Sequence, residues 1–122
     1  MEISKEEFEK IVGEEIDSLP EKTMRLINNV AFLVEDYPTA EQIKNARLGT
    51  QFELFGLYEG YIQSSRRNLG TVLPDRITLF RKAIMRNCRN LEELKKQVRS
   101  TIKHEIAHHF GSDEHGARKA GK

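Results

Sequence analysis

The feature that most constrains this chain is the position of its four histidines, which all fall between residues 104 and 115. The segment His104-Glu105-Ile106-Ala107-His108 has the pattern H-E-x-x-H. On an α-helix His104 and His108 lie about one turn apart on the same face, where both imidazoles can bind a single Zn²⁺. Glu105 lies beside the first ligand, where its carboxylate can activate a zinc-bound water as general base. The pattern therefore predicts a helix that carries a catalytic zinc site.

The residues that follow predict a turn that completes this site. Gly111 can adopt a positive φ, so it can end the helix and fold the chain back. The turn would bring Asp113 or Glu114 to the metal as the third ligand, and His115 is a further candidate. Two histidines and one carboxylate leave a coordination position open for water, which is the catalytic rather than the structural arrangement.

The helix that carries these residues is expected to begin at a capping box, with Asn90 as N-cap and Glu93 as the N3 residue. At about 100° per residue, Glu105 projects into the same arc as the apolar stripe of this helix. A carboxylate that points inward is costly unless it is paired, so a cation and a water-filled cleft are expected beside it. His109 points elsewhere and is expected to be packed or partly exposed. The predicted stripe consists of Leu91, Leu94, Val98 and Ile102.

The motif resembles that of the zincin metallopeptidases, and more narrowly the metzincin pattern H-E-x-x-H-x-x-G-x-x-H/D, with Glu114 where that pattern has His or Asp. Segments 54–60 and 73–81 make most of the chain similar to a small bacterial family of zincin-like metallopeptidases, described as minimal matrix-metalloproteinase-like domains. The resemblance implies zinc as cofactor, Glu114 as the third ligand, and a peptide or protein as substrate. It also implies that the substrate lies along an edge strand formed by residues 75–80.

The fold expected from the residues and the resemblance is α+β, a zincin-like single domain over residues 1–122. In it a small mixed β-sheet packs on an N-terminal helix and on the C-terminal active-site helix. Tyr58 and Tyr61 are expected to be core or surface aromatics rather than catalytic groups. The remaining predicted elements are a helix from the Ser4 cap to Leu19, a buried strand over 27–34, a short helix between Thr39 and Gly49, a hairpin over 52–62 around Glu59-Gly60, a surface loop over 63–71 and a strand over 75–80.

Composition narrows the class of protein. Lys and Arg number 20 and Asp and Glu 19, so bulk charge does not favour a nucleic-acid binder. The single Cys88 cannot form an internal disulfide, and no catalytic partner accompanies it at motif spacing, so a structural thiol in a reducing cytosol is expected. Neither a signal peptide nor an apolar run long enough to span a membrane is present, and a cytoplasmic location is expected. The sequence leaves the oligomeric state open.

Two alternatives to the peptidase remain. Bacterial rRNA-maturation endoribonucleases have the similar spacing H-x-x-x-H-x-x-G-x-D-H, which Asp113 and His115 partly match although Glu114 intervenes. Metzincins also have a methionine turn after the third ligand, whereas the methionines here are Met1, Met24 and Met85. A shallower, more open site is therefore expected, and a non-catalytic binding module with a vestigial metal site is the third hypothesis.

Overall fold

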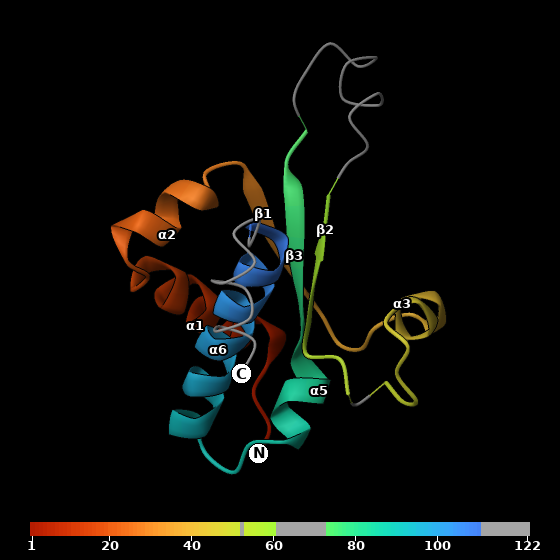
Figure 1. The fold of residues 1–122 in the computed structure, drawn as a ribbon. Coiled ribbons are helices and arrows are strands. Elements are labelled where there is room, and N and C mark those ends of the chain that lie inside the picture. The colour runs from red at the N-terminus through yellow and green to blue at the C-terminus, as the bar shows by residue number, and fades with distance from the viewer. Residues whose placement is uncertain (52, 61–72, 111–122) are drawn as a thin grey trace.

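The computed structural model describes residues 1–51, 53–60 and 73–110. Within these residues the fold is α+β, as predicted (Figure 1). The elements in chain order are α1 (Lys5–Asp17), α2 (Glu21–Leu26), β1 (Val30–Glu35), α3 (Ala40–Asn45), β2 (Gly56–Glu59), β3 (Asp75–Phe80), α5 (Arg81–Arg86) and α6 (Leu91–Phe110).

The sheet is mixed and has the strand order β1-β3-β2. β1 runs parallel to β3, with Val30 opposite Asp75, and β2 runs antiparallel to it, with Gly56 opposite Leu79. The expectation that residues 75–80 form an edge strand is therefore wrong, because β3 has a strand on each side. β2 is the edge strand that packs against α6.

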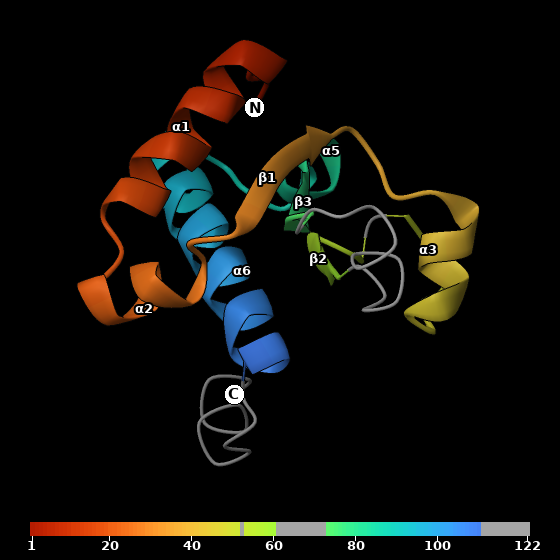
Figure 2. The ribbon, with the colours of Figure 1, turned by 90° about the horizontal axis from the view of Figure 1, so that it is seen from above.

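The core lies between the sheet and two helices. Figure 2 shows α1 and α6 side by side on one side of the sheet, with α3 away from both, beyond β2. Ile77 and Leu79 of β3 are fully buried against this helix layer. The core residues of the two helices are Phe8, Ile11 and Val12 from α1 and Leu94, Val98, Ile102 and Ile106 from α6.

Two burial predictions need correction. Leu91 is 43% exposed, so the apolar stripe of α6 begins one turn later, at Leu94, and continues to Ile106 beside the motif. The strand predicted over 27–34 begins only at Val30, because residues 27–29 form a turn after the unpredicted helix α2. Within β1 only Val34 is buried, and Leu33 is 41% exposed. β1 is an edge strand, and the helices cover only one of its faces.

The helix caps follow the sequence closely. Ser4 Oγ accepts a hydrogen bond from Glu7 N (3.1 Å) at the start of α1, and Thr39 and Gln42 form both bonds of a capping box at α3. At α6 Asn90 Oδ1 accepts from Glu93 N (2.9 Å) as predicted, but Glu93 Oε1 accepts from Arg89 N (2.8 Å) rather than from Asn90 N, so only half of the predicted capping box forms. These caps were predictable because each joins residues only three apart in the chain.

The ends of two other predicted elements differ from the structure. α3 ends at Asn45, before Gly49, and Arg47 rather than a glycine has a positive φ of 59°. Among the described residues β2 pairs antiparallel with β3, a partner that the sequence did not predict. The second half of the predicted hairpin (61–62) and the predicted loop 63–71 lie outside the described residues.

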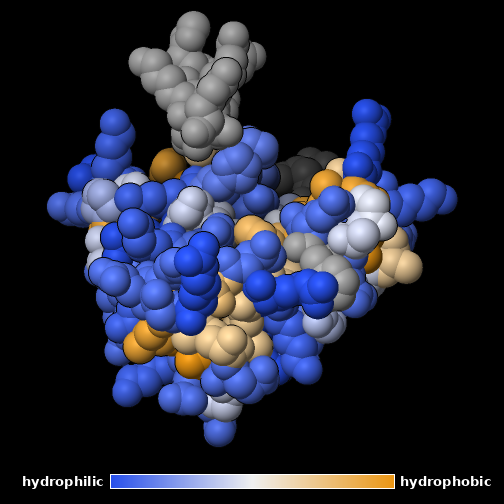
Figure 3. Space-filling model, turned by 90° about the horizontal axis from the view of Figure 1, so that it is seen from below, coloured by the Kyte–Doolittle hydropathy of each residue, from blue (hydrophilic) through white to orange (hydrophobic). Residues whose placement is uncertain are grey.

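Charged residues make up 32% of the chain. Figure 3 shows one face covered mostly by hydrophilic side chains, with a confined group of apolar ones among them. In the part of the chain that the structure describes, no helix combines the length and apolar character that crossing a bilayer requires.

The corrected stripe of α6 predicts a contrast between two leucines of one helix. Leu94 is fully buried and Leu91 is 43% exposed, so Leu94→Ala should lower the free energy of unfolding by about 2–5 kcal/mol. Leu91→Ala makes the same chemical change and should cost less than about 1 kcal/mol. Urea denaturation of both variants measures the difference, and equal losses would contradict the position of the stripe.

Candidate metal centre

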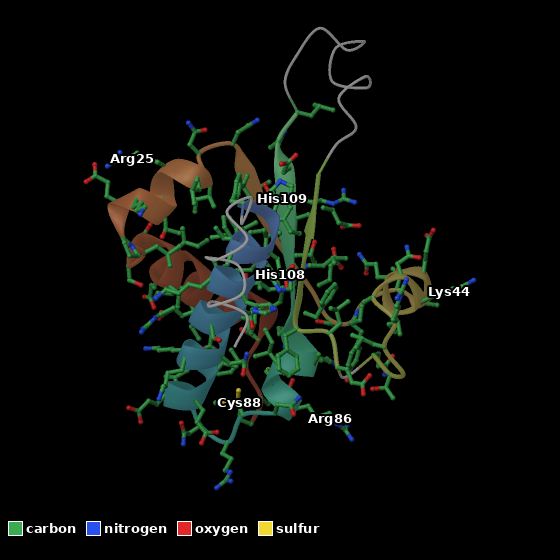
Figure 4. The ribbon with its side chains drawn as sticks, viewed as in Figure 1. Arg25, Lys44, Arg86, Cys88, His108 and His109 are labelled. Atoms are coloured by element: carbon green, nitrogen blue, oxygen red, sulfur yellow. The ribbon has the colours of Figure 1, made fainter. Side chains whose placement is uncertain are left out.

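The last turns of α6 hold the H-E-x-x-H motif, so the spacing of four residues does place the two histidines on one helix face. The rings of His104 and His108 have centroids 4.1 Å apart and planes inclined by 45°. His104 is half-buried and His108 is exposed to solvent. Figure 4 shows His108 at the end of α6 away from Cys88. Two imidazoles this close, one of them open to solvent, fit the binding of one zinc ion.

Glu105 turns from the same helix toward the sheet. Its Oε1 accepts a hydrogen bond from the backbone N–H of Tyr58 in β2, at 3.1 Å. Burial raises the pKa of the Glu105 carboxyl, while the Tyr58 bond and the neighbouring His104 and His108 act in the opposite direction. The raised pKa follows because a low-dielectric setting disfavours the charged form. The inward direction expected of Glu105 is thus observed, with a partner on the edge strand.

Tyr58 connects the motif to the sheet in three further ways. Its ring stacks on that of His109, with centroids 3.8 Å apart and planes within 11°. Its edge-on contact with Phe110 has a centroid distance of 5.7 Å, and its hydroxyl donates to Asp75 Oδ2 at 2.9 Å. The final turn of α6 is thereby tied to β2 and β3. His109 is partly exposed, with 40% of its side chain accessible, which is within the expectation of a packed or partly exposed residue, and Figure 4 shows it beside the strands.

No pattern in the sequence indicated this role for Tyr58. Its interpretation as a core or surface aromatic described the side chain only, whereas the contact with Glu105 is made by the backbone. The pairing Tyr58–Ile77 in the β2–β3 register sets the direction of that N–H. The alternation of backbone N–H directions along β2 could have indicated that Tyr58 N–H points away from β3, but only if the strand that pairs with β2 had been known.

Gly56 allows β2 and α6 to approach closely. A Cβ placed on Gly56 would lie 2.5 Å from Thr101 Cγ2 and 3.3 Å from Leu79 Cδ2. No side chain other than hydrogen fits this space without movement of the strand or the helix. Gly56 precedes Tyr58 by two residues on β2, so its contact with α6 brings the Tyr58 N–H within reach of Glu105.

A cavity of about 240 Å³ opens beside the motif, between the start of β2 and α6. Its walls include Glu105 and His104, so it adjoins the groups that the motif places together. The full lining consists of Glu53, Leu54, Phe55, Gly56, Gln97, Ser100, Thr101, His104 and Glu105.

The predicted third ligand, Glu114, lies outside the described residues, as do Gly111, Asp113 and His115. Among residues 1–51, 53–60 and 73–110, no three metal-binding side chains meet to form a complete site. The described part supplies two imidazoles as metal donors and, beside them, the Glu105 carboxylate, which suits a zinc site that one further protein ligand completes.

Cys88 plays no part in this centre. Its thiol is buried in the core, and burial raises its pKa. A raised pKa disfavours the thiolate that nucleophilic chemistry requires. The structural role expected from the sequence agrees with this position.

The α+β fold and the helix that bears H-E-x-x-H are those of a zincin-like protein. Comparison with known families matches residues 27–120 to a family described as zincin-like metallopeptidase. The match covers well over half of the chain, and the chain belongs to this family. No curated protein was found to match it.

The contact at Gly56 predicts a specific steric effect. Gly56→Ala should lower the free energy of unfolding by about 1–3 kcal/mol, because the new methyl group meets Thr101 Cγ2. The combination with Thr101→Ser, which removes that methyl group and keeps the hydroxyl, should recover part of the loss. Gly13, in the middle of α1, has nothing within 4 Å of an added Cβ, so Gly13→Ala should stabilise by about 0.4–1 kcal/mol. Urea denaturation tests all three variants, and a neutral Gly56→Ala would refute the tight contact.

The raised pKa of Glu105 predicts a pH dependence in the metal-free protein. A carboxyl whose pKa is raised on folding contributes stability below its unfolded pKa and loses it as the pH rises through the folded pKa. In the presence of a chelator, Glu105→Gln should therefore gain stability relative to wild type as the pH rises from acid to neutral. Urea denaturation across this range measures the gain, with the exposed Glu9→Gln as control for the loss of one carboxylate. A difference that stays constant with pH would contradict the burial of Glu105.

Proposed function

We propose that the protein is a zinc-dependent peptidase that hydrolyses peptide bonds in a peptide or protein substrate. In this proposal His104, His108 and Glu114 hold the metal, and Glu105 is the general base. When bound, zinc acts as a Lewis acid that polarises the scissile carbonyl and makes water more acidic. The observation that carries the proposal is the position of Glu105, held by the Tyr58 N–H next to two imidazoles of the same helix face.

The surroundings of Glu105 suit proton transfer. A general base works best when its pKa lies near the working pH, and burial raises the pKa of Glu105 in that direction. The carboxylate takes a proton from the attacking water and then donates it to the leaving amine. The hydrogen bond at 3.1 Å from Tyr58 N engages Oε1 and fixes the direction of the group during both transfers.

In this proposal the strand along which the substrate binds is β2, in place of β3 as expected from the sequence. An extended peptide can add to an exposed sheet edge through its backbone groups. Among the described residues β2 pairs only with β3, and on its other side the Tyr58 N–H donates to Glu105 of α6. A peptide bound along that side would lie beside Glu105 and His104. β3 cannot bind a peptide in this way, because it is paired with a strand on each side.

The proposal also includes the sequence-based predictions of reaction class, domain organisation and location. The family match favours a peptidase over the rRNA-maturation ribonuclease and over the binding module with a vestigial site. Residues 1–122 are proposed to form one domain that acts in the cytoplasm. The family relation itself supports a protein substrate but does not identify one.

The variant Glu105→Gln tests the proposed base. Gln keeps an oxygen that can accept from Tyr58 N–H, so the fold and the zinc content should not change. Loss of the base should lower kcat for peptide hydrolysis by about 10²–10⁴-fold. The measurements are cleavage of a peptide mixture read by mass spectrometry and metal analysis of the same samples, with Glu9→Gln as the matched control.

Other outcomes would decide against the proposal. Equal cleavage by wild type and Glu105→Gln would remove Glu105 from the mechanism. Cleavage of RNA that disappears in Asp113→Ala or His115→Ala would favour the ribonuclease. A zinc-loaded wild type that hydrolyses neither substrate would favour the binding module.

A further inference from the structure

The cavity beside Glu105 is the right size for one side chain. Its volume of about 240 Å³ is below the roughly 300–1,000 Å³ of sites that hold a whole small molecule. It extends along α6 from Glu105 through Thr101 to Gln97, toward the start of the helix. A peptide on the side of β2 away from β3 would pass its mouth, so a substrate side chain next to the scissile bond could enter it.

The lining of this cavity is amphipathic and acidic. Leu54, Phe55 and the backbone at Gly56 form an apolar wall, and Gln97 and Thr101 face it with a hydrogen bond between their side chains at 3.1 Å. Within the described part of the chain the cavity has two carboxylates in its lining, Glu53 and Glu105, and neither Lys nor Arg. A long side chain with an apolar stem and a positive end complements both features.

Glu53 is a preorganised anion in this lining. Its Oε1 accepts hydrogen bonds from the backbone N–H groups of Gly49 (2.8 Å) and Thr50 (3.3 Å). No described Lys or Arg forms an ion pair with it, and its side chain is exposed to solvent. A carboxylate fixed through one oxygen keeps the other available for a cationic partner, with little loss of side-chain freedom on binding.

We propose that the cavity between β2 and α6 is a substrate subsite for a lysine or arginine side chain, with Glu53 as its specificity-determining residue. The proposal rests on the proposed peptidase function and names the class of substrate that this function acts on. The aliphatic stem packs against Leu54 and Phe55, and the cationic end binds the Glu53 carboxylate. Glu105 keeps its role as base, because Tyr58 N–H holds it at the other end of the cavity.

The experiment compares matched peptides with the zinc-loaded, full-length protein. A peptide mixture first identifies the residues on each side of the cleaved bond. Peptides that carry Lys, Arg, norleucine or Glu at the selective position are then compared by kcat/KM. Norleucine keeps the apolar stem and lacks the charge, so the ratio of Lys to norleucine isolates the cationic end.

The expected result is a preference of about tenfold or more for Lys or Arg over norleucine, the order of one charge-assisted hydrogen bond. Glu53→Gln keeps an oxygen for Gly49 N and Thr50 N, and it should reduce this ratio toward unity, mainly through KM. Glu9→Gln removes an exposed carboxylate from α1 and should leave the ratio as in wild type. Equal rates for Lys and norleucine, or a ratio that Glu53→Gln does not alter, would overturn the proposal.

A binding measurement separates this inference from the proposed activity. In Glu105→Gln, a Lys peptide should shift the backbone amide signals of residues 53–56 and 97–101 in an NMR titration, and the norleucine peptide should do so only at about tenfold higher concentration. This holds even if no peptide is hydrolysed, in which case the peptidase proposal fails and the subsite stands. Absent shifts, or the same shifts with both peptides, would overturn the subsite.

Discussion

The hydrogen bond between Tyr58 N–H and Glu105 joins the two halves of this structure. On one side is a helix whose buried face, from Leu94 to Ile106, fixes its rotation against the core. On the other side is an edge strand whose register with β3 fixes the direction of its N–H groups. Because both are set by burial and pairing, the carboxylate of Glu105 is positioned by the fold as a whole. Gly56 makes the contact possible, since any larger residue there would separate strand and helix.

This arrangement explains how a small fold can accommodate the half-buried carboxylate of Glu105. An inward carboxylate at the end of an apolar stripe is unfavourable without compensation. Here a backbone N–H compensates part of the cost, and the adjacent histidines favour the charged form. The stacked pair Tyr58–His109 then holds the last turn of α6 against the sheet. The histidines that would bind metal, His104 and His108, and the residues that stabilise the helix end, His109 and Phe110, thus lie within one short segment.

The sequence predicted well what depends on near neighbours along the chain. The caps at Ser4, Thr39 and Asn90 and the extent of β3 were correct, because capping involves residues three apart and strand alternation is local. The placement of β3 at an edge was wrong, since strand order depends on which distant segments pair. For the same reason nothing in the sequence indicated that Tyr58, far from the motif in the chain, holds Glu105. The motif fixed the spacing of His104, Glu105 and His108 through helix geometry alone, whereas a third ligand beyond a turn has no such rule to place it.

Zinc affinity of the intact chain tests the central claim most directly, which is that His104 and His108 converge on a metal completed by one residue beyond Gly111. Competition with a chelator of known affinity should show a single tight zinc site in wild type, weakened by at least about 100-fold in His104→Ala, His108→Ala and Glu114→Ala. Asp113→Ala and His115→Ala should bind nearly as wild type does. Zinc binding that survives the loss of either His104 or His108, or a folded wild type that binds no zinc, would contradict the account.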